Sequence, residues 1–255
     1  MERSKSISER DIPDVNPLAL STQTIVIIIA VAIVFWSSAF FLWWQVELDK
    51  WLLISHNMLR TNLLVVSVAQ AFSKYGMAVI VLVYLIYLLF AFKDEKLRDS
   101  YRIYLLVFLM FGIAGIGGDI LKEIFSRPRP FVEYAGEINA FSDADTLAFP
   151  SGHATKSVAL ALPFLILIAA RDNWHKGVKI LLAIVAIGVC YSRVVLGAHY
   201  VSDVLAGVGM ALLCFPLVTL LNNQILRKMT KERLNIAIKV WAVILLLLMI
   251  YLTVK

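Results

Sequence analysis

The chain has 255 residues, of which 60% are hydrophobic and only 16% are charged, whereas an ordinary soluble domain is about half apolar and about a quarter charged. This composition, with a mean hydropathy of +0.81, excludes a soluble globular domain and indicates a polytopic membrane protein. The net charge of +6 does not indicate nucleic-acid binding, because the Lys and Arg residues lie in short loops beside apolar spans.

The predicted elements begin with a tail and a membrane span. Residues 1–21 mix charges of both signs around two prolines and are expected to form a solvated cytoplasmic tail. The first span is expected over 23–44. Segment 51–67 intersperses polar among apolar residues, which favours an interfacial helix on the membrane surface.

Six further apolar stretches, each of about the 17–25 residues that a bilayer requires, predict spans over 76–92, 101–121, 153–170, 178–196, 204–221 and 236–254. The expected fold class is an all-α integral membrane protein. Its membrane domain is expected over 22–222, and residues 223–255 are expected to add a basic cytoplasmic loop and one extra C-terminal transmembrane helix.

The distribution of cations predicts the orientation of these spans. Loops on the side of the N-terminus carry more Lys and Arg than the opposite loops, and cytoplasmic loops of membrane proteins show this excess. We therefore expect a multi-pass protein of the cell membrane with a cytoplasmic N-terminus. In this orientation the segments 122–153 and 193–203 both lie on the extracytoplasmic side.

Two polar segments on that side have the character of an anion site. Lys122 and Arg129 follow the third span, and Pro128 and Pro130 keep the chain around Arg129 extended. Residues 151–153 open the next span with a hydroxyl, a glycine and an imidazole. A helix that begins in this way presents free backbone N–H groups and a positive dipole end to an anion.

A third segment on the same side carries Arg193, His199 and Asp203. A carboxylate beside an imidazole fixes its tautomer and raises its basicity, which makes the histidine an effective nucleophile or base. Together the three segments supply cations, a helix N-terminus, two histidines and a carboxylate. Phosphoryl transfer requires this set of groups.

The pattern K-x6-RP, then PSGH, then SR-x5-H-x3-D resembles the three-part signature of the type-2 phosphatidic acid phosphatase superfamily. This superfamily comprises membrane lipid phosphatases and soluble acid phosphatase and vanadium haloperoxidase relatives. Every signature residue is present in order: Lys122, Arg129, Pro130, Pro150, Ser151, Gly152, His153, Ser192, Arg193, His199 and Asp203. The resemblance implies a six-helix membrane core over about 20–222 and says nothing of the last span.

The resemblance also implies a role for each site residue. His199 would attack phosphorus and become a phosphohistidine, Asp203 would orient it, and His153 would act as general acid and then as general base. The phosphoryl oxygens would be held by Lys122, Arg129, Ser151, Gly152 and Arg193. No metal or other cofactor is expected, since the cations take over the charge-stabilising role of a metal.

Three further charged residues have two interpretations each. Lys156, one helical turn beyond His153, and Arg127 are candidate head-group contacts; alternatively Lys156 extends to the membrane surface and Arg127 is a surface charge. Asp119 either orients Lys122 or neutralises it.

The expected function is hydrolysis, at the outer leaflet, of a phosphomonoester or diphosphate of a membrane lipid. Candidate substrates are phosphatidylglycerol phosphate, phosphatidate and undecaprenyl diphosphate, with a lipid A 1-phosphatase or a lipid phosphotransferase as alternatives within the superfamily. Head-group selectivity is expected to lie in loops such as 131–149. The expected partners are the lipid substrate and the bilayer, without nucleic acid, and no oligomeric state is predicted.

Two other functional classes are disfavoured. A transporter or channel would place ionisable residues at mid-span or break a helix at its centre, whereas these charges gather at one face. A vanadate-dependent haloperoxidase would share the anion site, but the lipid-spanning core argues against it.

Overall fold

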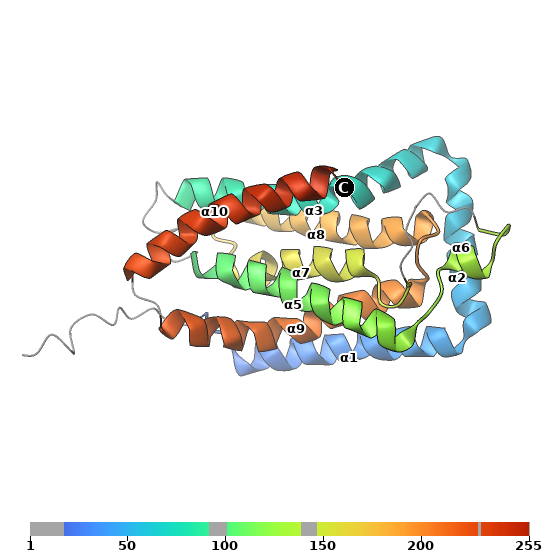
Figure 1. The fold of residues 1–255 in the computed structure, drawn as a ribbon, viewed down its shortest axis with the longest axis horizontal. Helices are drawn as coiled ribbons and strands as arrows, with labels where there is room; N and C mark the ends of the chain where they lie inside the picture. Colours follow the sequence, from blue (N-terminus) through green and yellow to red (C-terminus); the bar gives the residue numbers. More distant parts are fainter. Residues whose placement is uncertain (1–17, 92–100, 139–146, 229–230, 255) are drawn as a thin grey trace, which may run out of the picture.

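The computed structural model describes residues 18–91, 101–138, 147–228 and 231–254. These residues are almost entirely helical (Figure 1), which confirms the all-α prediction. The helices are α1 (Thr22–Trp44), α2 (Val46–Asn57), the 3-10 helix η1 (Met58–Thr61), α3 (Leu63–Ala91), α5 (Tyr101–Phe125), α6 (Pro130–Glu133), α7 (Gly152–Leu167), α8 (Asn173–Val195), α9 (Val201–Arg227) and α10 (Lys231–Val254).

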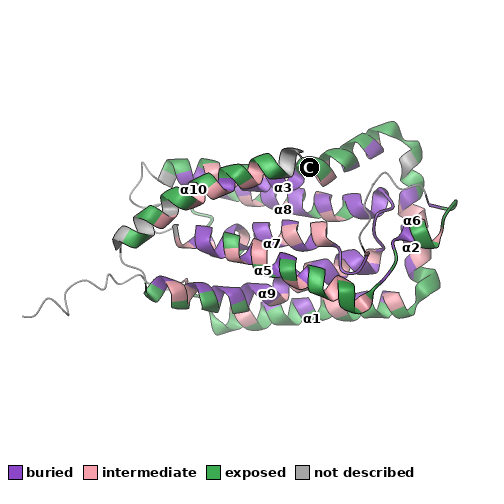
Figure 2. Ribbon diagram, viewed as in Figure 1, coloured by how far each residue is buried: buried purple, intermediate pink, exposed green. Residues whose placement is uncertain are grey.

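The core consists of six helices, α1, α3, α5, α7, α8 and α9, which run along one axis (Figure 1). The short helix α7 lies at the centre and contacts α3, α5, α8 and α9. Buried residues line the inner faces of the bundle, whereas the outer faces of α1 and α10 are exposed (Figure 2). Helix α2 crosses one end of the bundle, as expected of an interfacial helix that follows the first span.

Five of the described helices are long and apolar enough to cross a bilayer, namely α1, α3, α5, α8 and α9. The other two predicted spans correspond to α7 and α10, which contain shorter apolar helical stretches among the described residues. Helix α7 has 16 residues, which at about 1.5 Å per residue is about 24 Å, less than the about 30 Å of a hydrocarbon core. In α10, which has 24 residues, the apolar stretch found among the described residues is 239–251. A helix enclosed by four others, as α7 is, contacts little lipid and does not need to cross its full thickness.

The predicted interfacial helix over 51–67 has different bounds in the structure. Helix α2 ends at Asn57, and α3 already begins at Leu63 rather than near residue 76. The side chain of Asn62 accepts hydrogen bonds from the main-chain N–H groups of Leu64 (3.0 Å) and Val65 (3.4 Å) and so caps α3. Since neither Gly nor Pro occurs between residues 63 and 75, the polar residues there do not interrupt the helix.

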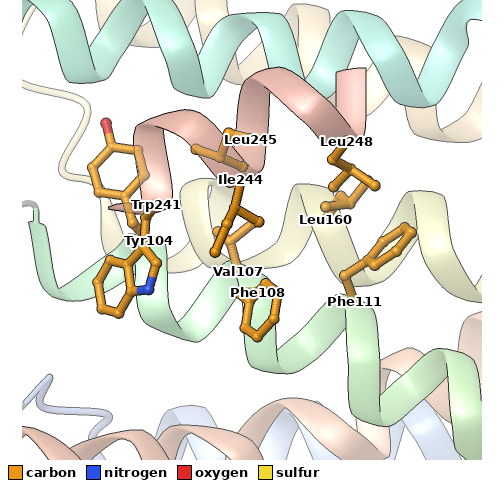
Figure 3. A pocket seen from close by; sticks show the side chains of 9 residues that line it. All are labelled: Tyr104, Val107, Phe108, Phe111, Leu160, Trp241, Ile244, Leu245 and Leu248. Carbon is orange, nitrogen blue, oxygen red and sulfur yellow. The ribbon is translucent and has the colours of Figure 1, made fainter. Parts of the chain in front are cut away.

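The extra C-terminal helix, α10, packs against α3 and α5. Figure 3 shows a small pocket between α10 and the core, which is lined by Trp241, Ile244, Leu245 and Leu248 of α10, by Tyr104, Val107, Phe108 and Phe111 of α5, and by Leu160 of α7. This lining is aromatic and aliphatic, which suits helix packing rather than chemistry.

The expected domain boundary at residue 222 falls inside α9, which continues to Arg227. Asn223 exchanges hydrogen bonds with the main chain of Leu18, at 2.9 Å and 3.0 Å. The last turns of α9 therefore pack as part of the core.

Candidate active site

The three signature segments meet at the end of the bundle that α2 crosses. The first contains Lys122 in the last turn of α5 and Arg129 just before α6. The second is the start of α7 at Gly152, and the third joins the end of α8 to the start of α9. Segment 139–146, part of the loop expected to set head-group selectivity, lies outside the described residues.

A tight turn between α8 and α9 positions His199. Helix α8 ends at Val195, and Gly197 then adopts a φ of +67°, a left-handed conformation that glycine tolerates best. The main-chain carbonyl of Arg193 accepts hydrogen bonds from the N–H groups of Ala198 (3.0 Å) and His199 (3.2 Å). The turn therefore holds His199 beside the C-terminal end of α8.

The two ring nitrogens of His199 face different partners. Nδ1 lies 3.4 Å from Oδ2 of Asp203, and Nε2 lies 2.8 Å from Nη1 of Arg129. Because a guanidinium can only donate, Nε2 must present its lone pair, and the proton of a neutral ring is then on Nδ1, facing the carboxylate. Arg129 Nη1 also donates to the carbonyl of Ala198, at 2.9 Å.

His199 is buried, and its surroundings favour the neutral ring. Burial, followed by the positive charges of Arg129, Arg193 and Lys122, holds the pKa of His199 well below its usual 6.5. At neutral pH the imidazole is therefore uncharged, and the lone pair of Nε2 accepts the N–H of Arg129 rather than a proton.

The first turn of α7 lies directly against the first turn of α9. Ser151 caps α7 by accepting a hydrogen bond from the N–H of Ala154 at 3.5 Å, and its own N–H donates to the carbonyl of Asp203 at 2.9 Å. A Cβ atom added at Gly152 would lie 3.5 Å from Nζ of Lys122. The ammonium group of Lys122 therefore lies beside the helix N-terminus, and such a pair of positive groups is suited to an anion.

Arg193 supplies a buried donor to the same region. Its Nη1 donates to the hydroxyl of Ser73 on α3. Its Nε is one of the buried side-chain nitrogens without a hydrogen-bond partner within the part of the chain that the structure describes. Buried donors are usually paired, so a guanidinium with an unused N–H is well suited to bind an anion.

Arg127 lies elsewhere than expected. It is buried, and it donates from Nη1 to Asp203 Oδ1 (2.9 Å) and to Ser202 Oγ (2.6 Å), and from Nη2 to Asp49 Oδ2 (3.0 Å). The interpretation of Arg127 as a surface charge is therefore wrong, and its guanidinium is already engaged by protein groups. Asp49, on α2, was not identified from the sequence, because a lone carboxylate between other charged residues carries no motif.

The remaining predicted residues surround this centre. Lys122 Nζ lies 3.5 Å from Asp119 Oδ1, at the limit of a hydrogen bond. His153 is half-buried in the first turn of α7. Lys156 lies one turn further along, with Cε 3.0 Å from the position that a Cβ at Gly115 of α5 would take.

Comparisons with known proteins agree with the signature. Residues 103–227 match the model of the PAP2 superfamily. The chain is 34% identical over 133 residues, 48% of its length, to phosphatidylglycerophosphatase B of Bacillus subtilis (strain 168). It is 36% identical over 88 residues, 34% of its length, to a protein of Escherichia coli (strain K12) named provisionally as the undecaprenyl-diphosphatase YbjG. The matched regions span 60% and 40% of the length of these two relatives.

One solved structure has a similar fold. It is the crystal structure of a transmembrane PAP2-type phosphatidylglycerolphosphate phosphatase from Bacillus subtilis, with a TM-score of 0.57 and 23% identity. The match covers 79% of the present chain and 96% of that chain. At this identity the likeness establishes the fold of a multi-pass membrane protein.

Proposed function

The chain belongs, through residues 103–227, to the PAP2 superfamily, and from this premise we propose that it is a membrane phosphatase that hydrolyses a lipid phosphate through a phosphohistidine. The observation that carries the proposal is the arrangement around His199. Its Nε2 lone pair faces Arg129 at 2.8 Å, and its other nitrogen faces Asp203. A phosphoryl oxygen that accepts this N–H of Arg129 in place of Nε2 would bring phosphorus beside Nε2 and release its lone pair for attack.

In the first step, Nε2 of His199 attacks phosphorus and forms the P–N bond as the P–O bond to the leaving group breaks. His153, which the negative charge of the bound phosphate would hold in its protonated form, transfers its proton to the departing oxygen. The Nδ1 proton stays on the ring, so the phosphohistidine is cationic and the carboxylate of Asp203 stabilises it. The contact of 3.4 Å between Nδ1 and Asp203 is long, as contacts in substrate-free catalytic sites often are.

In the second step, neutral His153 takes a proton from water, and the water oxygen attacks phosphorus. The P–N bond breaks, its electron pair returns to Nε2, and orthophosphate leaves. Charge on the equatorial oxygens is stabilised throughout by the donors already described: Lys122, Arg129, Arg193, Ser151 and the main-chain N–H of Gly152. This set requires no metal ion.

The substrate that fits this site is a phosphorylated lipid presented at the extracytoplasmic surface. The excess of cations in the opposite loops supports that orientation, and a site at one end of a membrane bundle suits a polar head on a buried tail. Phosphatidylglycerol phosphate and undecaprenyl diphosphate are supported by the names of the two relatives. Phosphatidate remains a third candidate.

The test is phosphate release by the purified protein in detergent across a panel of these three lipids, with and without EDTA. We expect release that EDTA does not reduce, inhibition by vanadate, and loss of turnover in the variant His199→Ala. A matched control is His56→Ala, which removes a histidine of α2 whose ring instead contacts Tyr191 and the carbonyl of Leu52.

Three outcomes would count against parts of the proposal. Full activity of His199→Ala excludes this nucleophile, and loss of wild-type activity with EDTA excludes a metal-free mechanism. Transfer of phosphate to an added lipid alcohol in preference to water would identify a phosphotransferase.

A further inference from the structure

Arg127 forms a buried ion pair with Asp203, on the side of the carboxylate away from His199. The two oxygens of Asp203 have different partners. Oδ2 faces the imidazole and accepts the main-chain N–H of Tyr200 at 2.9 Å, whereas Oδ1 accepts Arg127 Nη1 at 2.9 Å. Arg127 therefore fixes the rotation of the carboxylate that orients the proposed nucleophile.

Arg127 is itself held in place by α2. Its Nη2 donates to Asp49 Oδ2 at 3.0 Å, and its guanidinium lies 3.8 Å from the centroid of the Tyr200 ring. Asp49 also accepts the main-chain N–H of Ser202 at 3.1 Å and the hydroxyl of the same residue. Asp49 thus contacts the first turn of α9 and the guanidinium at the same time.

The charges in this cluster indicate what Asp49 contributes. Arg127 alone would neutralise Asp203, and His199 would then face only cations: Lys122, Arg129 and Arg193. A second carboxylate on the same guanidinium leaves the cluster with a net charge of −1. That negative charge favours the imidazolium-like phosphohistidine and keeps Nε2 basic enough to attack phosphorus.

We propose that Asp49 is a positioning residue of the active site, acting on His199 through Arg127 and Asp203, and that α2 supports the site through this one residue. This inference rests on the proposed function. It differs from a structural role for α2 because it assigns the Asp49 charge an effect on the chemistry of His199.

The test compares Asp49→Asn with Glu47→Gln, which removes the same charge from an exposed position of the same helix. Asparagine keeps an acceptor for the N–H of Ser202 but loses the charge. We expect kcat of Asp49→Asn to fall by about 10–100-fold, as for residues that orient a ligating imidazole, with KM little changed. Glu47→Gln should retain wild-type kcat.

The pH profile separates this role from a structural one. Loss of a nearby negative charge disfavours the protonated imidazole, so the acid limb of kcat/KM should move to lower pH in Asp49→Asn. The ionisable groups that face His199 and shape this limb are Lys122, Arg129, His153, Arg193 and Asp203, and all are retained in the variant.

If Asp49→Asn does not fold, a second variant tests the same inference. Arg127→Lys keeps the charge but loses the planar fork that reaches both carboxylates, so its kcat should fall while its acid limb stays in place. Wild-type kcat in whichever variant folds would overturn this inference but not the proposed function. The same holds if Asp49→Asn folds and the acid limb of its kcat/KM profile does not move. A wild-type protein inactive on the lipid panel overturns the proposed function and this inference with it.

Discussion

Gly207 of α9 lies against the main-chain carbonyl oxygen of Ser151, the residue that caps α7. A Cβ atom at position 207 would be only 2.7 Å from that oxygen and 3.0 Å from Oγ1 of Thr155. Van der Waals contact requires more room, so α7 and α9 can approach this closely only because residue 207 is glycine. This approach sets the distance between the anion site at the α7 N-terminus and the segment that carries His199.

The first prediction follows from this contact. Gly207→Ala should push the start of α7 away from α9 and destabilise the protein by about 1–3 kcal/mol, the usual cost of overpacking. Because the displaced helix start carries Ser151 and Gly152, kcat should fall more than the loss of folded protein explains. The measurements are thermal unfolding and kcat per folded molecule in detergent.

Gly177→Ala is the matched control. A Cβ at position 177, near the start of α8, would meet no atom within 4 Å, so this variant should lose neither stability nor kcat. If Gly207→Ala matches it in both, the close approach of the two helices does not constrain the site.

The second prediction concerns pH. Burial and the neighbouring cations lower the pKa of His199 below 6.5, so its ring stays neutral, and Nε2 nucleophilic, at pH values where an exposed histidine is protonated. The stability that goes with the neutral ring is likewise present above pH 6.5 and is lost as pH falls through the lower folded-state pKa. We expect kcat/KM to persist through pH 6.5 and to fall only at more acidic pH.

Substrate ionisation also affects such a profile, since a phosphate monoester loses its second proton with a pKa of about 6. The profile should therefore be measured with a lipid monophosphate and with a lipid diphosphate. An acid limb that falls at the same pH with both lipids reports an ionisation of the enzyme. If that limb lies at or above pH 6.5, the prediction is wrong.

Sequence reasoning identified the candidate site residues because the signature is local within each segment. His199 and Asp203 are four residues apart, and the structure places Asp203 in the first turn of α9, with its Oδ2 bonded to the N–H of Tyr200. Lys122 and Arg193 could also be identified, because each is a charged residue at the end of an apolar segment. Such signals need no knowledge of tertiary structure.

The supporting residues could not be found in this way. Asp49 reaches Arg127 across 78 positions of sequence, and Ser73 reaches Arg193 across 120. Neither residue stands out from its neighbours, and Gly207 is one of several glycines in apolar helices. Their importance arises from packing between helices, which periodicity does not specify. The enclosed position of α7 could not be predicted for the same reason, since apolar composition does not distinguish a lipid-facing helix from one enclosed by others.

The third prediction concerns Arg193, whose Nε is buried and lacks a partner among the described residues. Arg193→Lys keeps the charge but removes the planar set of donors that matches phosphate oxygens. We expect kcat/KM to fall by about 10²–10³-fold, the usual cost of losing one donor to developing charge, and vanadate to inhibit less strongly. Arg171→Lys, at an exposed position between α7 and α8, should leave both unchanged. Equal vanadate inhibition of wild type and Arg193→Lys would contradict a phosphate-binding role.

The fourth prediction tests Lys156 as a head-group contact. Its Cε lies over Gly115 of α5, and its Nζ is 5.8 Å from the ring centroid of Phe111, so the side chain extends across the α5 face one turn below His153. If Nζ binds a second phosphate, Lys156→Met should raise KM for a lipid diphosphate more than for a monophosphate, with kcat little changed. The measurement is KM for both lipids in the two proteins, with Lys176→Met, at an exposed position of α8, as control. If Lys156→Met leaves both KM values unchanged, Lys156 has no part in recognising the head group.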